Sequence, residues 1–79
     1  MNTFYVNLAT LEDVKRFSRL ANENACKIDV RSGRYVVNAK SIIGLFSIDR
    51  EEPIEVEFHG SNSQCDAFRQ GLGTLVAAV

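Results

Sequence analysis

The fold is decided by residues 26–37, which run Cys26-Lys27-Ile28-Asp29-Val30-Arg31-Ser32-Gly33-Arg34-Tyr35-Val36-Val37. Apolar residues at positions 26, 28 and 30 alternate with charged residues at 27, 29 and 31, which is the pattern of a strand with one buried face. Ser32-Gly33 is typical of a turn, and an apolar segment at 35–37 follows it. We therefore expect a β-hairpin whose two arms are neighbouring antiparallel strands of a sheet.

Two further strands are predicted on either side of this hairpin. Residues 3–8 and 54–58 both alternate apolar with polar side chains, so each strand is expected to bury one face. The apolar members are Phe4, Val6, Leu8, Ile54, Val56 and Phe58. The outer face of the later strand carries Glu55 and Glu57 and is therefore acidic.

The remaining segments predict three helices. Residues 11–25 place apolar side chains at steps of three and four, with Thr10 as the capping residue and Asp13 as its capping-box partner. This apolar face consists of Leu11, Val14, Phe17, Ala21 and Ala25. A short helix begins at Ser41, and a last helix runs from the polar cluster 61–63 to Val79. The order βαββαβα predicts an α+β fold, in which three helices cover one face of a four-stranded antiparallel sheet.

Length and composition restrict the functions that the chain can perform. Its 79 residues predict one domain, 1–79, which is too small for a large enzyme with a deep cleft, and the net charge of −1 argues against nucleic acid as a partner. No apolar run approaches the roughly 20 residues of a membrane span, and the first residues do not resemble a signal peptide. Cys26 and Cys65 lack metal-binding spacing. We expect a cytoplasmic protein with reduced thiols, no metal, no cofactor and no membrane partner.

The segment after the predicted hairpin is Val37-Asn38-Ala39-Lys40-Ser41-Ile42-Ile43-Gly44-Leu45. This segment and the order of the elements together resemble HPr, the histidine-containing phosphocarrier family of the bacterial sugar phosphotransferase system. The resemblance covers nearly the whole chain. It implies an HPr-like open-faced β-sandwich with the sheet order 1-4-2-3, and it implies protein partners, namely a kinase, a regulator or a component of the phosphotransferase system.

The chain departs from this family between the first strand and the first helix. Family members carry a Gly-x-His-x-Arg-Pro loop there, whose histidine accepts phosphate from enzyme I and donates it to sugar-specific transporter components. The corresponding residues here are Leu8-Ala9-Thr10-Leu11-Glu12-Asp13, which include no His, Arg or Pro. Because phosphate transfer needs an imidazole nucleophile and a positive environment, which Glu12 and Asp13 oppose, we expect none through this loop.

Two residues outside this loop are candidates for phosphorylation. Ser41 matches the serine that an ATP-dependent kinase phosphorylates in HPr proteins of Gram-positive bacteria, and the product acts as corepressor of a carbon-catabolite regulator. Capping of the short helix is the simpler role of this serine, and both roles stay open. His59, the single histidine, is expected at the end of the sheet opposite the start of the first helix, in a structural and solvent-facing role.

The resemblance also implies a partner-binding surface. In the family the short helix docks enzyme I, the kinase and the regulator, and the matching residues here are Ile42, Ile43, Leu45 and Phe46. Their alternative role is to complete a thin core. Basic residues of the first helix lie beside the phosphorylated positions in the family, and those of this chain are Lys15, Arg16 and Arg19. Pairing with Glu12 within the helix is their simpler role.

These observations lead to competing hypotheses about function. The first is a divergent HPr-like protein that is not an enzyme, has lost histidine phosphotransfer and serves as a regulatory or binding module, with Ser41 as a phosphorylation site. The alternative is a working phosphocarrier of the phosphoenolpyruvate-dependent sugar phosphotransferase system. A third is an interaction domain unrelated to sugar uptake, because one fold can host unrelated functions.

Overall fold

Residues 2–77 are described by the structure, a computed structural model, and they form four strands and three α-helices. The elements are β1 (Asn2–Val6), α1 (Leu11–Asn22), β2 (Ile28–Ser32), β3 (Tyr35–Asn38), α2 (Ile42–Phe46), β4 (Ile54–Phe58) and α3 (Asn62–Leu72), followed by a single 3-10 turn (Gly73–Leu75). This order confirms the predicted βαββαβα arrangement.

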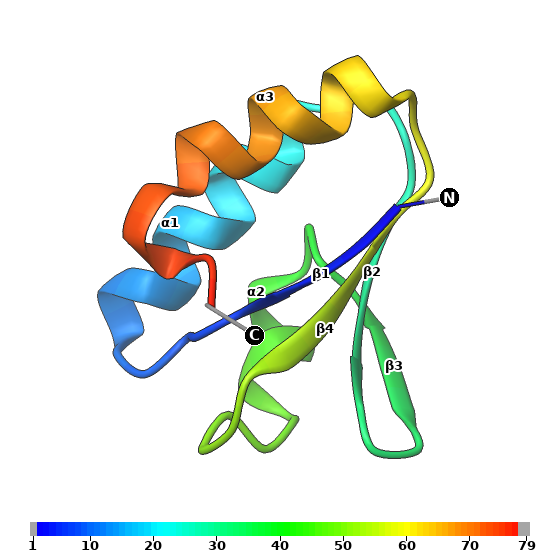
Figure 1. The fold of residues 1–79 in the computed structure, drawn as a ribbon. Helices are drawn as coiled ribbons and strands as arrows, with labels where there is room; N and C mark the ends of the chain where they lie inside the picture. The colour runs from blue at the N-terminus through cyan, green and yellow to red at the C-terminus, as the bar shows by residue number, and fades with distance from the viewer. Residues whose placement is uncertain (1, 78–79) are drawn as a thin grey trace.

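The strands form one antiparallel sheet with the order β1-β4-β2-β3. Val56 of β4 pairs with Phe4 of β1 on one side and with Val30 of β2 on the other, so the buried residues of three strands lie in one row. The three helices cover the same face of the sheet, and α1 and α3 lie side by side across it (Figure 1). The predicted α+β fold and sheet order are therefore confirmed.

Aromatic side chains join α1 and α3 to the sheet. The ring of Phe68 on α3 lies 5.6 Å from that of Phe58, 5.8 Å from that of Phe17 and 6.1 Å from that of Phe4, measured between centroids. Phe17 and Phe58 are completely buried. Burial of a side chain of this size contributes about 1.5–3 kcal/mol to stability, so this cluster is a principal reason that the helices stay on the sheet.

The helix caps form as the sequence predicts. The Thr10 hydroxyl accepts a hydrogen bond from the Asp13 amide at 3.1 Å, and the Asp13 carboxylate accepts one from the Thr10 amide at 3.1 Å, which completes a capping box. Ser61 and Gln64 form a second capping box at the start of α3. Such caps satisfy amides that have no partner within the helix, and each contributes about 1 kcal/mol.

The predicted first helix is too long at its C-terminal end. It ends at Asn22 instead of residue 25, and both Leu11 and Ala25 are exposed instead of contributing to the apolar face. The buried face of α1 consists of Val14, Phe17, Ser18 and Ala21. The helix ends where the Asn24 side chain donates to the Leu20 carbonyl at 3.1 Å, because this bond occupies an acceptor of the last turn.

Two predicted strands also have different bounds. The first strand ends at Val6 instead of residue 8, because its partner β4 begins at Ile54, directly opposite Val6. Leu8 is nevertheless buried, as expected. The first strand of the hairpin, β2, begins at Ile28 instead of Cys26, because Ile28 is the first of its residues to pair with β4.

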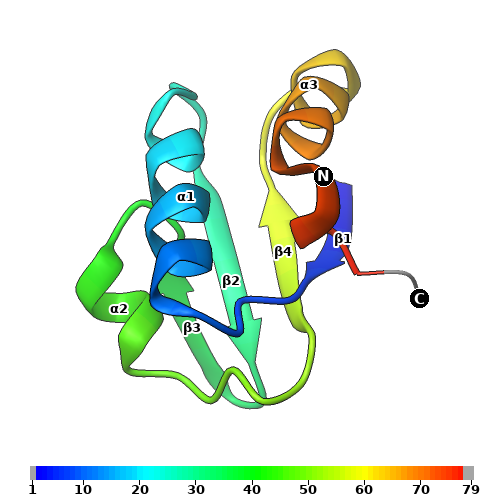
Figure 2. The same cartoon turned by 90° about the vertical axis from the view of Figure 1, so that its left-hand side faces the viewer.

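The last predicted helix ends early as well. It stops at Leu72, because Gly73 adopts a φ of 57°, a left-handed value that breaks the helix and that glycine accommodates without strain. Val76 then bridges to Val6, and the Ala77 amide donates to the Tyr5 carbonyl at 2.8 Å, so the C-terminal segment covers the edge of β1 (Figure 2). Val79, expected in this helix, lies outside the described residues.

Within residues 2–77, no helix has the length and apolar character that crossing a membrane requires.

Candidate functional site

Ser41 stands between β3 and α2, and α1 holds the backbone just before it. The Lys40 carbonyl accepts hydrogen bonds from the Ser18 hydroxyl at 3.2 Å and from the Asn22 side-chain amide at 3.1 Å. The Lys40 ammonium donates to the Asn24 carbonyl at 2.6 Å. Ser18 is itself buried on the helix face that packs on the sheet. These contacts fix the direction in which the chain enters α2.

The side chain of Ser41 caps α2. Its hydroxyl accepts a hydrogen bond from the Gly44 amide at 3.1 Å, and Ser41 is half-buried. A β-carbon on Gly44 would lie 3.3 Å from both the Ser41 hydroxyl and the Val37 side chain, so the glycine allows α2 to approach β3 closely. The capping role of Ser41 is therefore present in the structure. An anionic group at this position would also meet an amide donor.

The exposed apolar side chains of α2 form one surface, which we call the α2 surface and which consists of Ile42, Ile43 and Phe46. Ile43 is 84% exposed, whereas Ile42 and Phe46 are each 41% exposed. Leu45, expected on the same surface, is instead completely buried, because it is the residue of this short helix that points into the core. The expectation that Leu45 belongs to the exposed surface is thus corrected. Leu45 completes the core, whereas Ile42, Ile43 and Phe46 form the exposed surface.

Arg50 supports this surface, although it was not among the residues predicted from the sequence. Its guanidinium lies over the ring of Phe46, 5.1 Å from the centroid, and donates to the Leu8 carbonyl at 3.4 Å. It therefore links α2 to the connection between β1 and α1. Arg50 lies in an irregular connection without hydrophobic periodicity, so no pattern in the sequence places it here.

The three basic residues of α1 do not form one patch. The Arg16 guanidinium donates to the Gly71 carbonyl of α3 at 2.9 Å, so it points away from α2. Lys15 stands on the edge of α1 toward α2, because residues three and seven positions later on the helix contact the Lys40 carbonyl. It pairs with Glu12 at 4.0 Å, as the helical spacing predicts. Arg19 is exposed.

In the connection between β1 and α1, residues 7–10, a carboxylate is bound to two backbone amides. Residues 7–10 contain no histidine. The Asp13 carboxylate accepts hydrogen bonds from the amides of Ala9 at 3.2 Å and Thr10 at 3.1 Å, so a carboxylate already occupies donors to which an anion could bind. A phosphate dianion here would have to displace this like-charged group.

His59 lies far from that connection. It follows β4, whose last residue pairs with Asn2 at the beginning of β1, so His59 is at the end of the sheet opposite the start of α1, as predicted. Its Nε2 atom lies 3.4 Å from the Asp29 carboxylate on β2. The predicted position is confirmed, although the carboxylate neighbour was not anticipated.

The cysteines lie in the predicted apolar environment. Cys65 is buried on α3, and Cys26 is half-buried. Burial raises the pKa of the Cys65 thiol above its ordinary value of 9.0, against the opposing effect of the nearby Arg69 guanidinium. A thiol with a raised pKa is a poor nucleophile, so Cys65 acts as a small core residue.

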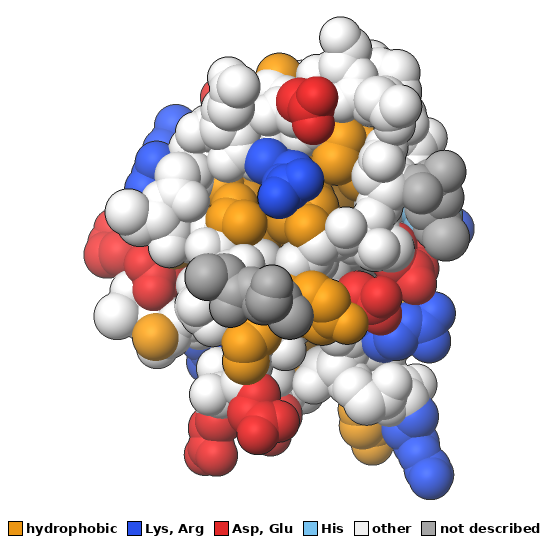
Figure 3. All heavy atoms as spheres, in the orientation of Figure 1, with side chains coloured by type: hydrophobic (Ala, Val, Ile, Leu, Met, Phe, Trp, Pro, Cys, Tyr) orange, Lys and Arg blue, Asp and Glu red, His pale blue; other side chains and the backbone are white. Residues whose placement is uncertain are grey.

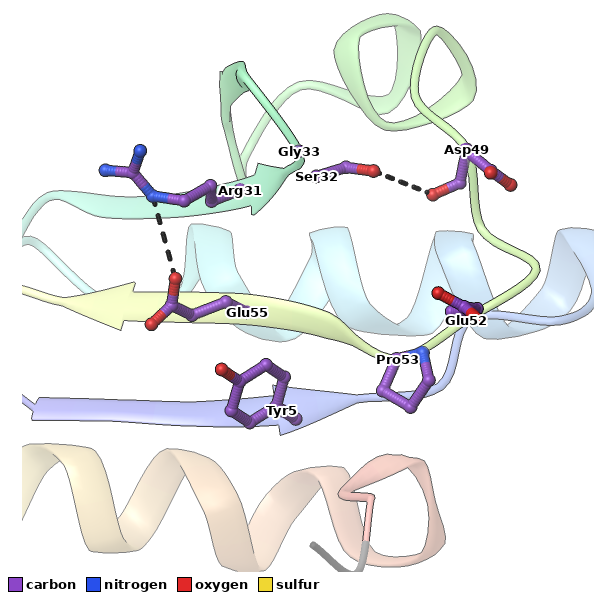
Figure 4. A pocket seen from close by; sticks show the side chains of 8 residues that line it. All are labelled: Tyr5, Arg31, Ser32, Gly33, Asp49, Glu52, Pro53 and Glu55. Carbon is purple, nitrogen blue, oxygen red and sulfur yellow. Dashed lines mark hydrogen bonds and ion pairs between the residues drawn. The ribbon is translucent and has the colours of Figure 1, made fainter.

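The surface outside α2 carries charged side chains of both signs and also exposed apolar ones, namely Tyr5, Leu11, Tyr35 and Val36. On the face seen in Figure 3, acidic and basic side chains are dispersed among uncharged ones. A hollow of about 250 Å³ lies at one end of the uncovered sheet face, where Arg31 pairs with Glu55 at 3.6 Å and the Ser32 hydroxyl donates to the Asp49 carbonyl at 3.2 Å (Figure 4). Arg31 and Glu55 are engaged with each other there, and the lining also includes the exposed Glu52.

Solved structures resemble this chain over nearly its whole length. The phosphocarrier protein HPr from Bacillus anthracis str. Ames superposes with a TM-score of 0.70 at 25% identity, covering 96% of this chain and 94% of that one. HPr-C-His from Thermoanaerobacter tengcongensis gives 0.68 at 19% identity, with 92% and 97% covered. The histidine-containing phosphocarrier protein of a Mycoplasma gives 0.72 at 14% identity, with 98% of both chains covered.

The chain has the HPr fold. No protein-family model and no curated protein matches the sequence. The similarity is therefore one of structure, and the functional residues have to be judged one by one.

Proposed function

We propose that this chain is a divergent HPr-like protein that binds a protein partner through the α2 surface and does not carry phosphate on histidine. The observation that carries the proposal is the connection between β1 and α1. It has no histidine, and its amides at Ala9 and Thr10 are bound by the Asp13 carboxylate. An HPr-like protein without a histidine in this connection cannot accept phosphate there, but it retains the α2 surface for binding a partner.

The partner is a protein because the exposed part of α2 is apolar and uncharged. Ile43 is almost fully exposed beside Ile42 and Phe46, and α2 has no acidic residue in its first turn and no basic residue in its last. Exposed aliphatic and aromatic side chains that lie together favour protein contacts over contacts with charged ligands.

We further propose that phosphorylation of Ser41 regulates this binding. Ser41 precedes the α2 surface directly, and a phosphate there adds negative charge where the Gly44 amide can donate to it. Lys40 precedes it and Lys15 stands on the facing edge of α1. The Lys40 ammonium donates to the Asn24 carbonyl and Lys15 pairs with Glu12, so each would have to exchange that contact for one with the phosphate. The added charge beside Ile42 changes which partner surfaces the apolar residues can accept.

Incubation with ATP and an HPr kinase tests the role of Ser41. The unaltered chain is expected to incorporate phosphate, Ser41→Ala none, and Ile43→Ser less, because the kinase would dock on the α2 surface. Ser63→Ala, which removes an exposed hydroxyl from α3, serves as the matched control and is expected to be labelled normally. Absence of label on the unaltered chain, or equal labelling of Ser41→Ala, contradicts the regulatory role.

The second candidate function is phosphate transfer within the sugar phosphotransferase system. The similarity to structures that are named as phosphocarriers favours it. His59 would then have to accept the phosphate, although it lies beside the Asp29 carboxylate, which repels a phosphate dianion. Labelling by enzyme I and phosphoenolpyruvate separates the two candidates.

A further inference from the structure

The sheet face that the helices leave uncovered carries charged side chains in register. Asp29 on β2 lies opposite Glu57 on β4, and Arg31 lies opposite Glu55, two residues away along each strand. Because side chains alternate between the two faces of a strand, these four point away from the buried residues between them. His59 comes two residues after Glu57 and therefore lies on the same side.

Three of these side chains converge at one point. One donor atom each of Asp29, Glu57 and His59 lies within 4.8 Å of the others, and the Asp29 carboxylate is 3.4 Å from His59 Nε2. The side chains of Asp29 and Glu57 are only 14% and 15% exposed, while that of His59 is 32% exposed. The pairing of β2 with β4 fixes the backbone of Asp29 and Glu57, so little conformational entropy is lost when their donor atoms come together.

This donor set suits a divalent transition metal. Zn²⁺ binds imidazole nitrogen and carboxylate oxygen at about 2.0–2.2 Å, so adjacent donors of a tetrahedral ion lie about 3.3 Å apart. The separation of 3.4 Å between His59 Nε2 and Asp29 Oδ2 is already close to that value. We propose that Asp29, Glu57 and His59 bind Zn²⁺, with water in the fourth position.

Neighbouring cations moderate the affinity without blocking the site. Both nitrogens of Arg31 that bond to Glu57 donate to the same oxygen, Oε2, and the Lys27 ammonium approaches the Oδ2 atom of Asp29 at 3.6 Å. Glu57 therefore keeps its second oxygen for the metal. The Oδ2 atom of Asp29 is also the oxygen that lies 3.4 Å from His59 Nε2, so the ion would compete with the Lys27 ammonium for it. Lys27 is 73% exposed on its side chain, so its replacement does not disturb packing. Removing its charge is expected to tighten the binding of Zn²⁺.

Titration of the chain with Zn²⁺, followed calorimetrically, tests the site. Saturable binding to one site is expected, and His59→Gln, Asp29→Asn and Glu57→Gln are each expected to weaken it by about tenfold or more, as loss of a ligand or its support does. Lys27→Gln is expected to strengthen it. Two control variants test whether general surface charge or a thiol binds the metal instead: Glu51→Gln removes an equal charge outside the cluster, and Cys26→Ser removes the more accessible thiol. Both should bind as the unaltered chain does.

Absence of saturable binding to the unaltered chain overturns the proposal, and so does binding that His59→Gln leaves unchanged. Far-ultraviolet circular dichroism of each variant verifies that it is folded, and the imidazole nitrogen resonances of His59 should shift on addition of Zn²⁺ and return with a chelator. The cluster lies on the sheet face that does not carry the buried residues, whereas α2 packs against the buried face. Its test is therefore independent of the proposed binding and phosphorylation at α2.

Discussion

Replacing Ser41 by alanine is expected to lower the free energy of unfolding by about 1 kcal/mol, because the substitution removes the hydroxyl that caps α2. The Gly44 amide, which donates to that hydroxyl at 3.1 Å, would lose its partner at a half-buried position. For a domain of this length a loss of that size lowers the melting temperature by about 4–8 °C. Ser41→Asp replaces the cap by a carboxylate, which is an equally good capping group, so its stability should stay within about 0.5 kcal/mol of the unaltered chain.

Urea unfolding followed by circular dichroism measures these differences. Ser63→Ala is the matched control, since it removes an exposed hydroxyl that makes no side-chain hydrogen bond among residues 2–77 and should change stability by less than about 0.5 kcal/mol. The expected order is Ser41→Asp near the unaltered chain and Ser41→Ala clearly below both. If Ser41→Ala were as stable as the control, or if Ser41→Asp lost as much as Ser41→Ala, the capping geometry derived from the structure would be wrong.

Other positions give equally definite expectations. A methyl group on Gly60 would lie 2.6 Å from the fully buried ring of Phe58, so Gly60→Ala should lower the free energy of unfolding by about 1–3 kcal/mol. A methyl group on Gly71 would have its nearest neighbour at 3.9 Å, so Gly71→Ala should raise the free energy of unfolding by up to about 1 kcal/mol. Urea unfolding that shows changes of the same sign for both variants would refute this. Ile43→Ser should change stability by less than about 0.5 kcal/mol and Leu45→Ala should cost about 2–5 kcal/mol, and equal losses would contradict the burial assigned to them. Because the pKa of the Cys65 thiol is raised in the folded state, folding disfavours the thiolate, and stability should fall as pH rises above 9.0; Cys65→Ala should fall less steeply, and identical slopes would show that the thiol does not contribute.

The order of the elements could be predicted because apolar residues recur with the period of a strand or a helix. Phe4, Val6, Ile54, Val56 and Phe58 are all buried, as the alternation predicted. Boundaries were less predictable, because a strand ends where its partner ends. That depends on the pairing of β1 with β4, which is formed by residues about 50 positions apart and is invisible to local periodicity.

The candidate site was predicted in part. The capping position of Ser41 follows from local sequence, since a serine before a short apolar helix is a typical cap. The sequence left the surface and core roles of Ile42, Ile43, Leu45 and Phe46 open, and the structure shows Ile43 as the most exposed of the four. The burial of Leu45 depends on which way this short helix faces the core. The contact of Arg50 with Phe46 depends on the path of an irregular connection, so neither could be derived from local pattern.

The cluster on the uncovered sheet face could not be predicted for a different reason. Asp29 and Glu57 are neighbours only because β2 and β4 pair in one particular register. A shift of one residue would turn one of the two side chains to the other face of the sheet. The spacing of the three residues along the chain therefore carries no sign of a metal site, whereas the sheet brings their donor atoms within 4.8 Å.

The most direct test of the central claim is incubation of the chain with enzyme I and labelled phosphoenolpyruvate, beside an HPr phosphocarrier as the positive control. The account predicts that the control acquires acid-labile phosphate and that this chain acquires none, because its first connection offers a carboxylate from Asp13 where an imidazole would be needed. Acid-labile phosphate on this chain that disappears in His59→Gln would contradict the account.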